Sequence, residues 1–296
     1  MARPVRIFSI VYGQRFIDWF SSGCLRSLSW PKNLAALRKA EAWDVWTMPA
    51  DEERVRWLAE SLGIPVETHL LTPYSDGDDA ERKEQLRLAL TFQMRACRDS
   101  KAFLWIAPDS IFGDGSIESF MRLGSVPGIC VATAPMRVNA DGFIEALRDP
   151  MSNADLVRLS FERMHRGFRD ANAELPETNS HISGVSWRQI GEGLYAVTHL
   201  KHSSYLMQPT KKDVDWWERM NKFGAYDHSL PKLLVADQRQ RVIGSSDAAF
   251  VAELTPEDVG VPKLKPTDPN EPDRYDHEQH GHHAVNRNVV CIWRSA

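Results

Sequence analysis

Short apolar runs alternate with amphipathic segments along the first half of the chain, and this alternation limits the fold more than any other feature. The runs have the length of strands, whereas the segments between them have helical spacing of apolar residues. The expected strands are Val5–Val11, Trp43–Met48, Val66–Leu71, Phe103–Ala107 and Gly128–Ala134, and the expected helices are Gln14–Leu28, Glu52–Leu62 and Ala80–Arg98. Strands that alternate with helices form a parallel sheet with helices on both faces. The sequence therefore predicts an α/β fold with a mostly parallel, Rossmann-like sheet.

The segment Lys101–Gly124 carries the most suggestive chemistry. Its apolar run ends at Pro108 and is followed at once by Asp109, with Asp114 between two glycines a few residues later. Ser116 is expected to cap the helix that follows. Ligands of open α/β sheets collect at the carboxyl ends of strands, where Asp109 would lie. Such a carboxylate can hold a divalent cation against phosphate, and a turn carboxylate that caps a helix is an equally good interpretation.

The second half of the chain is less regular. The expected elements are a helix over Asn153–Arg169, strand-like pieces within Leu194–Leu206, two short helices within Trp216–Leu234, a strand and a turn within Gln240–Leu254, a proline-rich extended loop over Glu257–Asp276, and a last strand or docked tail at Asn288–Trp293. These pieces predict an irregular α+β part after the regular α/β half.

Composition and motifs exclude several classes of protein. A formal net charge of −4 without a stripe of Lys and Arg argues against a nucleic-acid partner. No apolar stretch approaches the ~20 residues that span a bilayer, and the first apolar run has the pattern of a core strand rather than a signal peptide. Four scattered cysteines favour reduced thiols and a cytoplasmic setting. The sequence has no P-loop, dinucleotide-binding glycine motif or nucleophile elbow.

The order of the elements resembles that of the GT-A nucleotide-sugar glycosyltransferases over Val5–Arg137. The first strand ends in Val11, Tyr12 and Gly13, where the first loop of that family contacts the nucleotide. Phe103–Ile117 has the layout of the family's strand, acidic turn and helix, whose Asp-x-Asp motif binds a metal that bridges the diphosphate. The resemblance implies a GT-A-like sheet and transfer of a sugar from a nucleotide-sugar donor to an acceptor that the sequence does not identify.

One departure from the family's motif concerns the metal. Ala107 stands at the first acidic position of the motif, so that only Asp109 can be carried over. Asp114 could supply a second carboxylate at a different spacing, and His199 or His202 could supply the late imidazole ligand of similar enzymes, or could simply form local hydrogen bonds. The implied cofactor is Mn²⁺ or Mg²⁺. A metal held by one carboxylate with phosphates and waters, no metal, and lost catalysis remain open.

Three further residues have expected roles in binding or catalysis. Arg137 could pair bidentately with phosphate, or could form a surface salt bridge. An inverting transfer needs a carboxylate that takes the proton of the acceptor hydroxyl. Asp227 is the first candidate for this base and Asp247 the second, because both lie in predicted loops. Each of them could instead be a turn former.

The resemblance also suggests how the chain is organised. Residues 1–150 would form the half that binds the nucleotide sugar, residues 151–258 the acceptor side of the same domain, and residues 259–296 an extended tail rich in Pro and His. The expected function is that of a glycosyltransferase. The alternatives are a non-catalytic GT-A-like binding or assembly module that has lost the metal motif, and another α/β transferase or nucleotide-binding enzyme with an acidic strand end.

Overall fold

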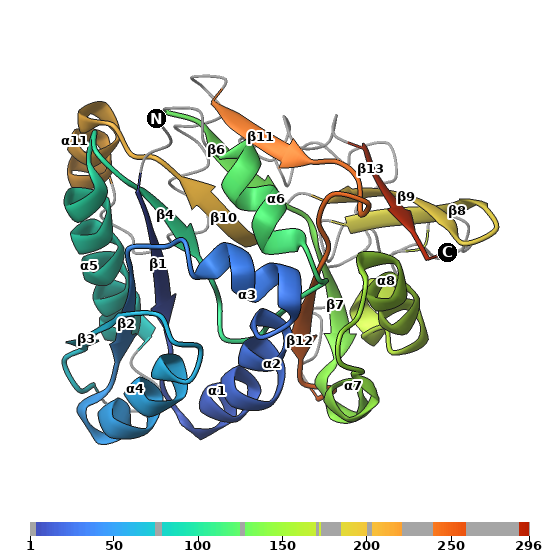
Figure 1. Ribbon diagram of the computed structural model, residues 1–296, viewed down its shortest axis with the longest axis horizontal. Coiled ribbons are helices and arrows are strands. Elements are labelled where there is room, and N and C mark those ends of the chain that lie inside the picture. The colour runs from blue at the N-terminus through green and yellow to red at the C-terminus, as the bar shows by residue number, and fades with distance from the viewer. Residues whose placement is uncertain are drawn as a thin grey trace.

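The computed structural model describes residues 4–74, 79–124, 128–169, 172, 185–199, 203–220, 239–258 and 290–295 (Figure 1). In chain order its elements are β1 (Val5–Ile10), α1 (Gln14–Trp19), the π-helix η1 (Phe20–Cys24), α2 (Leu25–Leu28), α3 (Pro31–Leu37), β2 (Ala42–Thr47), the 3-10 helix η2 (Pro49–Asp51), α4 (Glu52–Glu60), β3 (Val66–Leu70), α5 (Asp79–Cys97), β4 (Ala102–Trp105), β5 (Ser110–Phe112), α6 (Ser116–Leu123), β6 (Cys130–Thr133), β7 (Pro135–Asn139), α7 (Ala140–Ala146), α8 (Asn153–Glu162), α9 (Arg166–Arg169), β8 (Val185–Gly191), β9 (Leu194–His199), β10 (Ser203–Met207), α11 (Lys211–Met220), β11 (Gln240–Ile243), β12 (Val251–Thr255) and β13 (Val290–Arg294).

A seven-stranded sheet with the order β11-β6-β10-β4-β1-β2-β3 forms the centre of the molecule. β1 pairs in parallel with both β2 and β4, and β2 pairs in parallel with β3. β10 is antiparallel to β4 and β6, whereas β11 is parallel to β6. The sheet is therefore mixed but mostly parallel, as the alternation of strands and helices predicts.

Both faces of this sheet are covered. Along β1, Ile7 belongs to a buried cluster that includes residues of α1 to α4, whereas Phe8 belongs to a cluster that includes residues of α5 and α11. Successive side chains of a strand point to opposite faces, so that a strand covered on both sides is apolar throughout. The prediction of an α/β sheet with helices on both faces is confirmed.

Two small sheets complete the architecture. β5, β12 and β7 form one of them, with β12 antiparallel to β5 and parallel to β7. β13, β9 and β8 form the other, an antiparallel sheet built from the irregular second half of the chain. β4 and β5 are close in sequence but lie in different sheets, so that the turn with Asp109 joins the central sheet to the β5-β12-β7 sheet.

Several local predictions need correction. The sequence from Trp30 to Leu34 breaks the helical pattern of Gln14–Leu28 and predicts no helix, but α3 starts at Pro31, because proline fits the first turn of a helix, where no backbone N–H is needed. The helix expected over Asn153–Arg169 ends at Glu162 and resumes at Arg166, because the chain between them pairs with β7: Asn139 N donates to Arg163 O and His165 N donates to Arg137 O.

The expected N-cap of α6 is also wrong. Gly115 rather than Ser116 is the N-cap, because the Ser116 hydroxyl bonds to Asn153 and to the carbonyl of Phe250. The sequence also did not anticipate β5, β7 or β8, three strands of the small sheets. Within the described ranges, no helix combines the length and apolar composition that a bilayer crossing requires.

Candidate functional site

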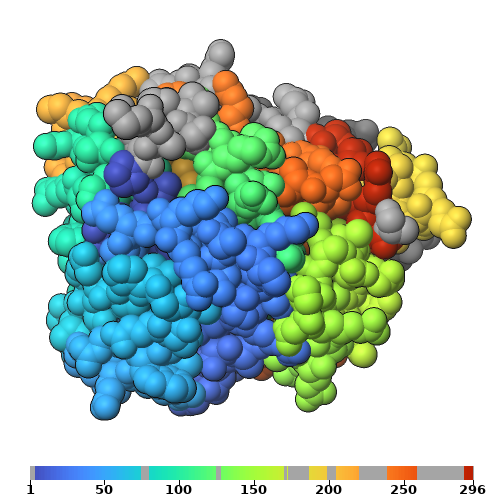
Figure 2. All heavy atoms as spheres, in the orientation of Figure 1, coloured from blue at the N-terminus to red at the C-terminus, as the bar shows by residue number. Residues whose placement is uncertain are grey.

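A cavity of about 700 Å³ opens where β1, β7 and β12 end. Its lining comes from α1, from the start of α7, from α9 and from the residues after β12: Arg15, Trp19, Asp141, Arg166, Pro256, Glu257 and Asp258. Figure 1 shows α1 and α7 at the lower end of the molecule, and in Figure 2 the surface of α1 to α3 directly borders that of α7 and α8. Ligands of α/β proteins collect at the carboxyl ends of strands, which makes this cavity the candidate site.

The cavity is lined by charges of both signs. Arg15 and Arg166 contribute guanidinium groups, and Asp141, Glu257 and Asp258 contribute carboxylates. Among the described residues, none of these five side chains forms an ion pair or a side-chain hydrogen bond with another. Their donors and acceptors therefore remain available to a polar ligand.

A group of three charged residues lies on the β5-β12-β7 sheet beside this cavity. Glu253 of β12 stands opposite Ser110 on one side and Arg137 on the other, and Arg137 Nε lies 3.3 Å from Glu253 Oε1. Leu254 N donates to the backbone carbonyl of Asp109 at 2.8 Å, which ties the turn after β4 to β12. Pro256 in the cavity wall comes three residues after Glu253, a distance of roughly 10 Å along an extended chain.

The two carboxylates of this group share one guanidinium. Burial and the negative charge of Glu253 raise the pKa of Asp109, Arg137 opposes both effects, and the resulting pKa is about 7. When both carboxylates are ionised, the group has one negative charge in excess, which a bound cation would relieve.

The π-helix η1 contacts the turn that carries Asp109. Cys24, the last residue of η1, donates its thiol to the carbonyl of Ala107 at 3.6 Å, and burial, with the nearby Asp109 charge, raises the pKa of this thiol well above its usual value. Cys24 is therefore a protonated core thiol and not a nucleophile. Gly23 allows the close approach, because a Cβ there would lie 2.6 Å from Ile111 Cδ1 of β5.

His165 supports the wall between the charged group and the cavity. It is 2% exposed, and its Nδ1 accepts a hydrogen bond from Gly167 N at 3.2 Å, so that Nε2 carries the proton of the neutral ring. Among the described residues Nε2 has no hydrogen-bond partner. Burial lowers the pKa of His165, the Pro256 carbonyl raises it, and Arg137 and Arg166 lower it. The ring is therefore neutral at pH 7.

The loop after β1 lies at the same edge of the central sheet. Gly13 has a φ of 77°, which favours glycine, and its N–H donates to Asp51 Oδ2 at 3.0 Å. Val11 is fully buried and donates its N–H to the carbonyl of Trp46, and the Tyr12 ring lies edge-on to Tyr74 at 6.2 Å. Of these three predicted nucleotide contacts, Tyr12 and Gly13 are accessible from outside, whereas Val11 could contribute only its backbone.

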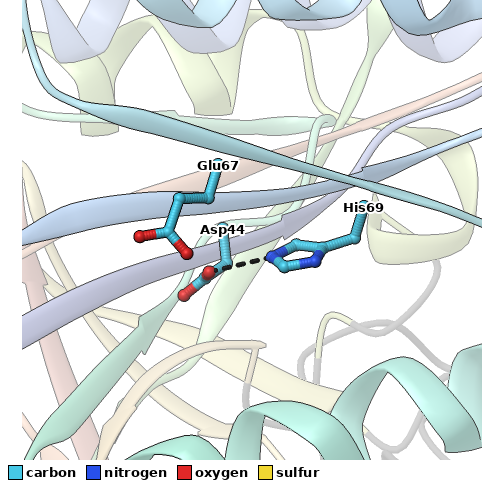
Figure 3. A group of neighbouring side chains, drawn as sticks. All are labelled: Asp44, Glu67 and His69. Atoms are coloured by element: carbon cyan, nitrogen blue, oxygen red, sulfur yellow. Dashed lines mark hydrogen bonds and ion pairs between the residues drawn. The ribbon is translucent and has the colours of Figure 1, made fainter.

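A second carboxylate group lies on the central sheet, away from the ends of β7 and β12. Asp44 of β2 and Glu67 and His69 of β3 each offer one ligand atom, and these atoms lie within 4.8 Å of one another, so that the group could hold a metal ion (Figure 3). Arg6 of β1 already supplies a positive charge there. Its Nε and Nη2 donate to the two oxygens of Asp44 at 2.6 and 2.7 Å, and Nη2 also lies 2.7 Å from Glu67.

The partners of Asp44 satisfy its charge. Burial would raise the pKa of Asp44, but hydrogen bonds from Arg6 and from His69 Nε2, the latter at 3.0 Å, hold the pKa below its usual value. The hydrogen bond to Asp44 likewise raises the pKa of Arg6. A bidentate arginine in this position acts as the cation of the group.

The other predicted site residues are dispersed. Asp114 Oδ1 accepts hydrogen bonds from Lys32 N and Asn33 N and so caps α3, while Asn33 Oδ1 accepts from Gly115 N and Ile117 N at the start of α6. Asp247 is exposed and lies 3.9 Å from Arg294 in the turn before β12. His199 is the last residue of β9. Asp227 and His202 lie outside the described residues.

Sequence reasoning missed Glu253, His165 and the charged lining of the cavity. A signal for Glu253 was present, because it is the single charge in the otherwise apolar run from Ala248 to Leu254. Such a charge within a buried strand marks a polar site or a buried ion pair. His165 and the lining residues gave no comparable signal.

Comparison with known proteins adds a general likeness of shape. No protein-family model matches the sequence, and no curated protein sequence matches it significantly. Among solved structures, it resembles the inositol-1-phosphate CTP transferase from T. maritima (10% identity, 86% of this chain and 91% of that one, TM-score 0.45). It also resembles GalNAc-T7 with UDP, GalNAc and Mn²⁺ (6% identity, 87% and 45%, TM-score 0.46) and the mannosyltransferase PcManGT from Pyrobaculum calidifontis with GDP-Man and Mn²⁺ (11% identity, 88% and 59%, TM-score 0.44). At these scores no functional inference rests on the likeness.

Proposed function

We propose that this protein transfers a sugar from a nucleotide-sugar donor, and that the transfer takes place at the edge where Asp109 and Glu253 lie beside the cavity. The observation that carries the proposal is this pair of carboxylates, one in the turn after β4 and one on β12, with a single guanidinium against Glu253 and an open cavity beside them. A divalent cation would offset the negative charge of such a group and could in turn bind a diphosphate.

The donor contacts follow from the positions of three elements. The loop of Tyr12 and Gly13, with the backbone of Val11, would contact the nucleoside. Arg137 would contact the diphosphate, because a guanidinium can pair with a phosphate group. The cation bound to that phosphate would neutralise the two carboxylates. The cavity beyond Pro256 would then receive the transferred sugar and the acceptor.

The residues present fit a hard divalent cation. Asp109 and Glu253 offer carboxylate oxygens, which Mg²⁺ and Mn²⁺ prefer, and Glu253 supplies the second carboxylate that Ala107 does not. A bound cation would neutralise charge that builds up on the leaving diphosphate. The protein itself would hold the donor against Arg137 and exclude water with the wall formed by His165 and Pro256.

Proton transfer needs a base on the acceptor side. Asp227 and Asp247 stay the proposed bases, and the carboxylates that line the cavity offer further acceptors for the proton. The division into a donor-binding half (1–150) and an acceptor-side half (151–258) is part of the same proposal, since Arg15, Trp19 and Asp141 of the first half face Arg166 and Glu257 of the second across the cavity. The cytoplasmic setting stays a prediction from the cysteines, all four of which are buried free thiols.

The test is a thermal-shift and calorimetric titration with UDP, GDP and their sugar conjugates, with and without Mn²⁺. We expect a nucleotide-dependent rise in melting temperature that needs Mn²⁺ and is lost in Asp109→Asn and in Glu253→Gln. Glu118→Gln, an exposed carboxylate on α6, is the matched control and should behave like the parent.

Two outcomes would count against the proposal. Absence of a shift with every nucleotide would remove the donor site altogether. Binding of a nucleotide sugar without release of its sugar, to water or to a glycoside, would favour the alternative of a non-catalytic binding module.

A further inference from the structure

We propose that the cavity at the ends of β1, β7 and β12 is a carbohydrate subsite, in which Trp19 stacks on the face of a pyranose ring and Asp141, Glu257 and Asp258 accept hydrogen bonds from its hydroxyls. This inference rests on the proposed function and gives it an acceptor class: the acceptor would be a glycoside or oligosaccharide.

Trp19 is held in a fixed position at the cavity wall. One side of its side chain packs against the apolar cluster that includes Phe143 and Leu254, and it also lines the cavity. The Phe16 ring, 40% exposed, lies edge-on to it, with 5.7 Å between ring centroids and an angle of 85° between the planes. An aromatic ring that is already ordered loses little entropy when a ligand stacks on it.

The charges of the cavity favour a neutral polyol over a nucleotide. Three carboxylates face two guanidinium groups, so that the lining is net negative and would repel a phosphate-bearing ligand. Carboxylates and guanidinium groups that do not pair with one another supply both acceptors and donors, which suits the hydroxyl groups of a sugar. An aromatic face surrounded by such groups offers a pyranose both its apolar and its polar contacts.

The position of the cavity agrees with this assignment. Pro256 and Glu257 continue β12 beyond Glu253, so that a sugar in the cavity would lie roughly 10 Å from the proposed diphosphate site. A separation of this size suits an acceptor that meets the donor sugar between the two sites. Arg15 and Arg166 would donate hydrogen bonds to further hydroxyls.

The experiment is ligand-observed saturation-transfer NMR on the full chain without nucleotide or metal. The probes are the methyl glycosides of glucose, galactose, mannose and N-acetylglucosamine and the disaccharides maltose, cellobiose and lactose, with glycerol as a polyol that has no ring face. We expect transfer to the ring protons of at least one pyranoside and none to glycerol. Trp19→Ala should weaken that binding about tenfold or more, and Trp19→Phe by less.

Trp57→Ala is the matched control, because Trp57 is a tryptophan on α4 with 69% of its surface exposed and no part in the cavity lining. Retained binding in Trp19→Phe would separate loss of stacking from a folding defect. No signal from any probe, or equal binding in Trp19→Ala and the parent, overturns the inference. If Trp19→Ala instead weakens binding of UDP or GDP, the ring is a nucleobase platform and the inference also fails.

The failures of the two proposals can be told apart. Asp109→Asn should leave saccharide binding unchanged, since the probes need neither metal nor donor. If the protein binds no nucleotide but still binds a pyranoside through Trp19, the donor assignment fails and the carbohydrate subsite stands.

Discussion

Two groups of charged residues in this molecule have similar components but different charge balances. The Asp44 group on β2 and β3 contains two carboxylates, a histidine and Arg6, and the Asp109 group contains two carboxylates and Arg137. Arg6 binds Asp44 through two short hydrogen bonds, and the pKa of Asp44 lies below its usual value. Arg137 makes a single 3.3 Å contact with Glu253, and the pKa of Asp109 is raised to about 7.

The difference separates a structural role from a functional one. A buried carboxylate whose charge is matched by a bidentate guanidinium has no need of an external cation. A carboxylate that is desolvated next to a second one stores unfavourable electrostatic energy, which a ligand can release. By this criterion the group of Asp44, Glu67 and His69 stabilises the pairing of the strands, although its ligand atoms are close enough for a metal site. The group at Asp109 is the candidate for ligand binding.

The largest effect is expected from breaking the satisfied group. Arg6→Met should lower the free energy of unfolding by about 3–5 kcal/mol, because it leaves the carboxylate of Asp44 buried without its partner. Urea denaturation at pH 7 measures this loss. Arg137→Met, the matching change in the other group, should cost much less, since Arg137 is 35% exposed and makes one contact. A cost for Arg137→Met as large as that for Arg6→Met would refute the contrast.

A smaller effect is expected from the pH dependence of Asp109. The folded-state pKa of about 7 lies above the ordinary value of 3.8. Between these two pH values, the folded protein keeps a proton on Asp109 that the unfolded chain has released. The contribution of Asp109 to stability therefore falls as pH rises from about 4 to about 7 and stays low above it. Asp109→Asn should remove this pH dependence. Compared with the parent, its free energy of unfolding should be more favourable by about 1–3 kcal/mol at pH 8 than at pH 4.

Thermal unfolding of the parent and of Asp109→Asn across this pH range measures the effect. Asp44→Asn is the opposite case, because the folded-state pKa of Asp44 is lowered. The contribution of Asp44 is present above its unfolded pKa and is lost as pH falls, so that its replacement should cost stability at pH 7. Gains or losses of the same sign for both variants at pH 8 would show that the two groups do not differ as described.

The smallest effect is expected at His165. Its folded-state pKa is lowered, first by burial, so that the unfolded chain takes up a proton more readily. Its contribution to stability is complete above the unfolded pKa of about 6.5 and is lost as pH falls below that value. In His165→Gln, the free energy of unfolding should fall by about 0.5–1 kcal/mol less between pH 7 and pH 5 than in the parent. NMR titration of the ring checks the cause, and a His165 that titrates at or above 6.5 would contradict it.

Much of the fold follows from local sequence patterns. The apolar runs that form β1, β2, β3, β4 and β6 are bounded by clear breakers, and strand length with alternating helices is enough to predict a parallel sheet. β7 was missed because it follows β6 with only Ala134 between them and begins at Pro135, so that one apolar run serves two sheets. The break between α8 and α9 was missed because it results from pairing with β7, a tertiary contact that periodicity does not encode.

The site was predictable only in part, for the same reason. The position of Asp109 at a strand end follows from its neighbours in sequence. Its partner Glu253 is 144 residues away and meets it through the register of β5 with β12. Asp114 is the next carboxylate along the chain and could supply a second ligand only at a different spacing from the family's, and in the structure it caps α3. Spacing in the sequence can identify candidate ligands that share one loop, but it cannot identify residues that two paired strands bring together.

Mn²⁺ binding measured by electron paramagnetic resonance of the free ion, in the presence of UDP or GDP, tests the central claim most directly. The variants are Asp109→Asn combined with Glu253→Gln, and His69→Gln, which alters the rival group without removing Arg6. We expect the parent and His69→Gln to bind Mn²⁺ alike, and the double variant to bind at least tenfold more weakly. Loss of Mn²⁺ binding in His69→Gln with binding retained in the double variant would contradict the account and move the metal to Asp44.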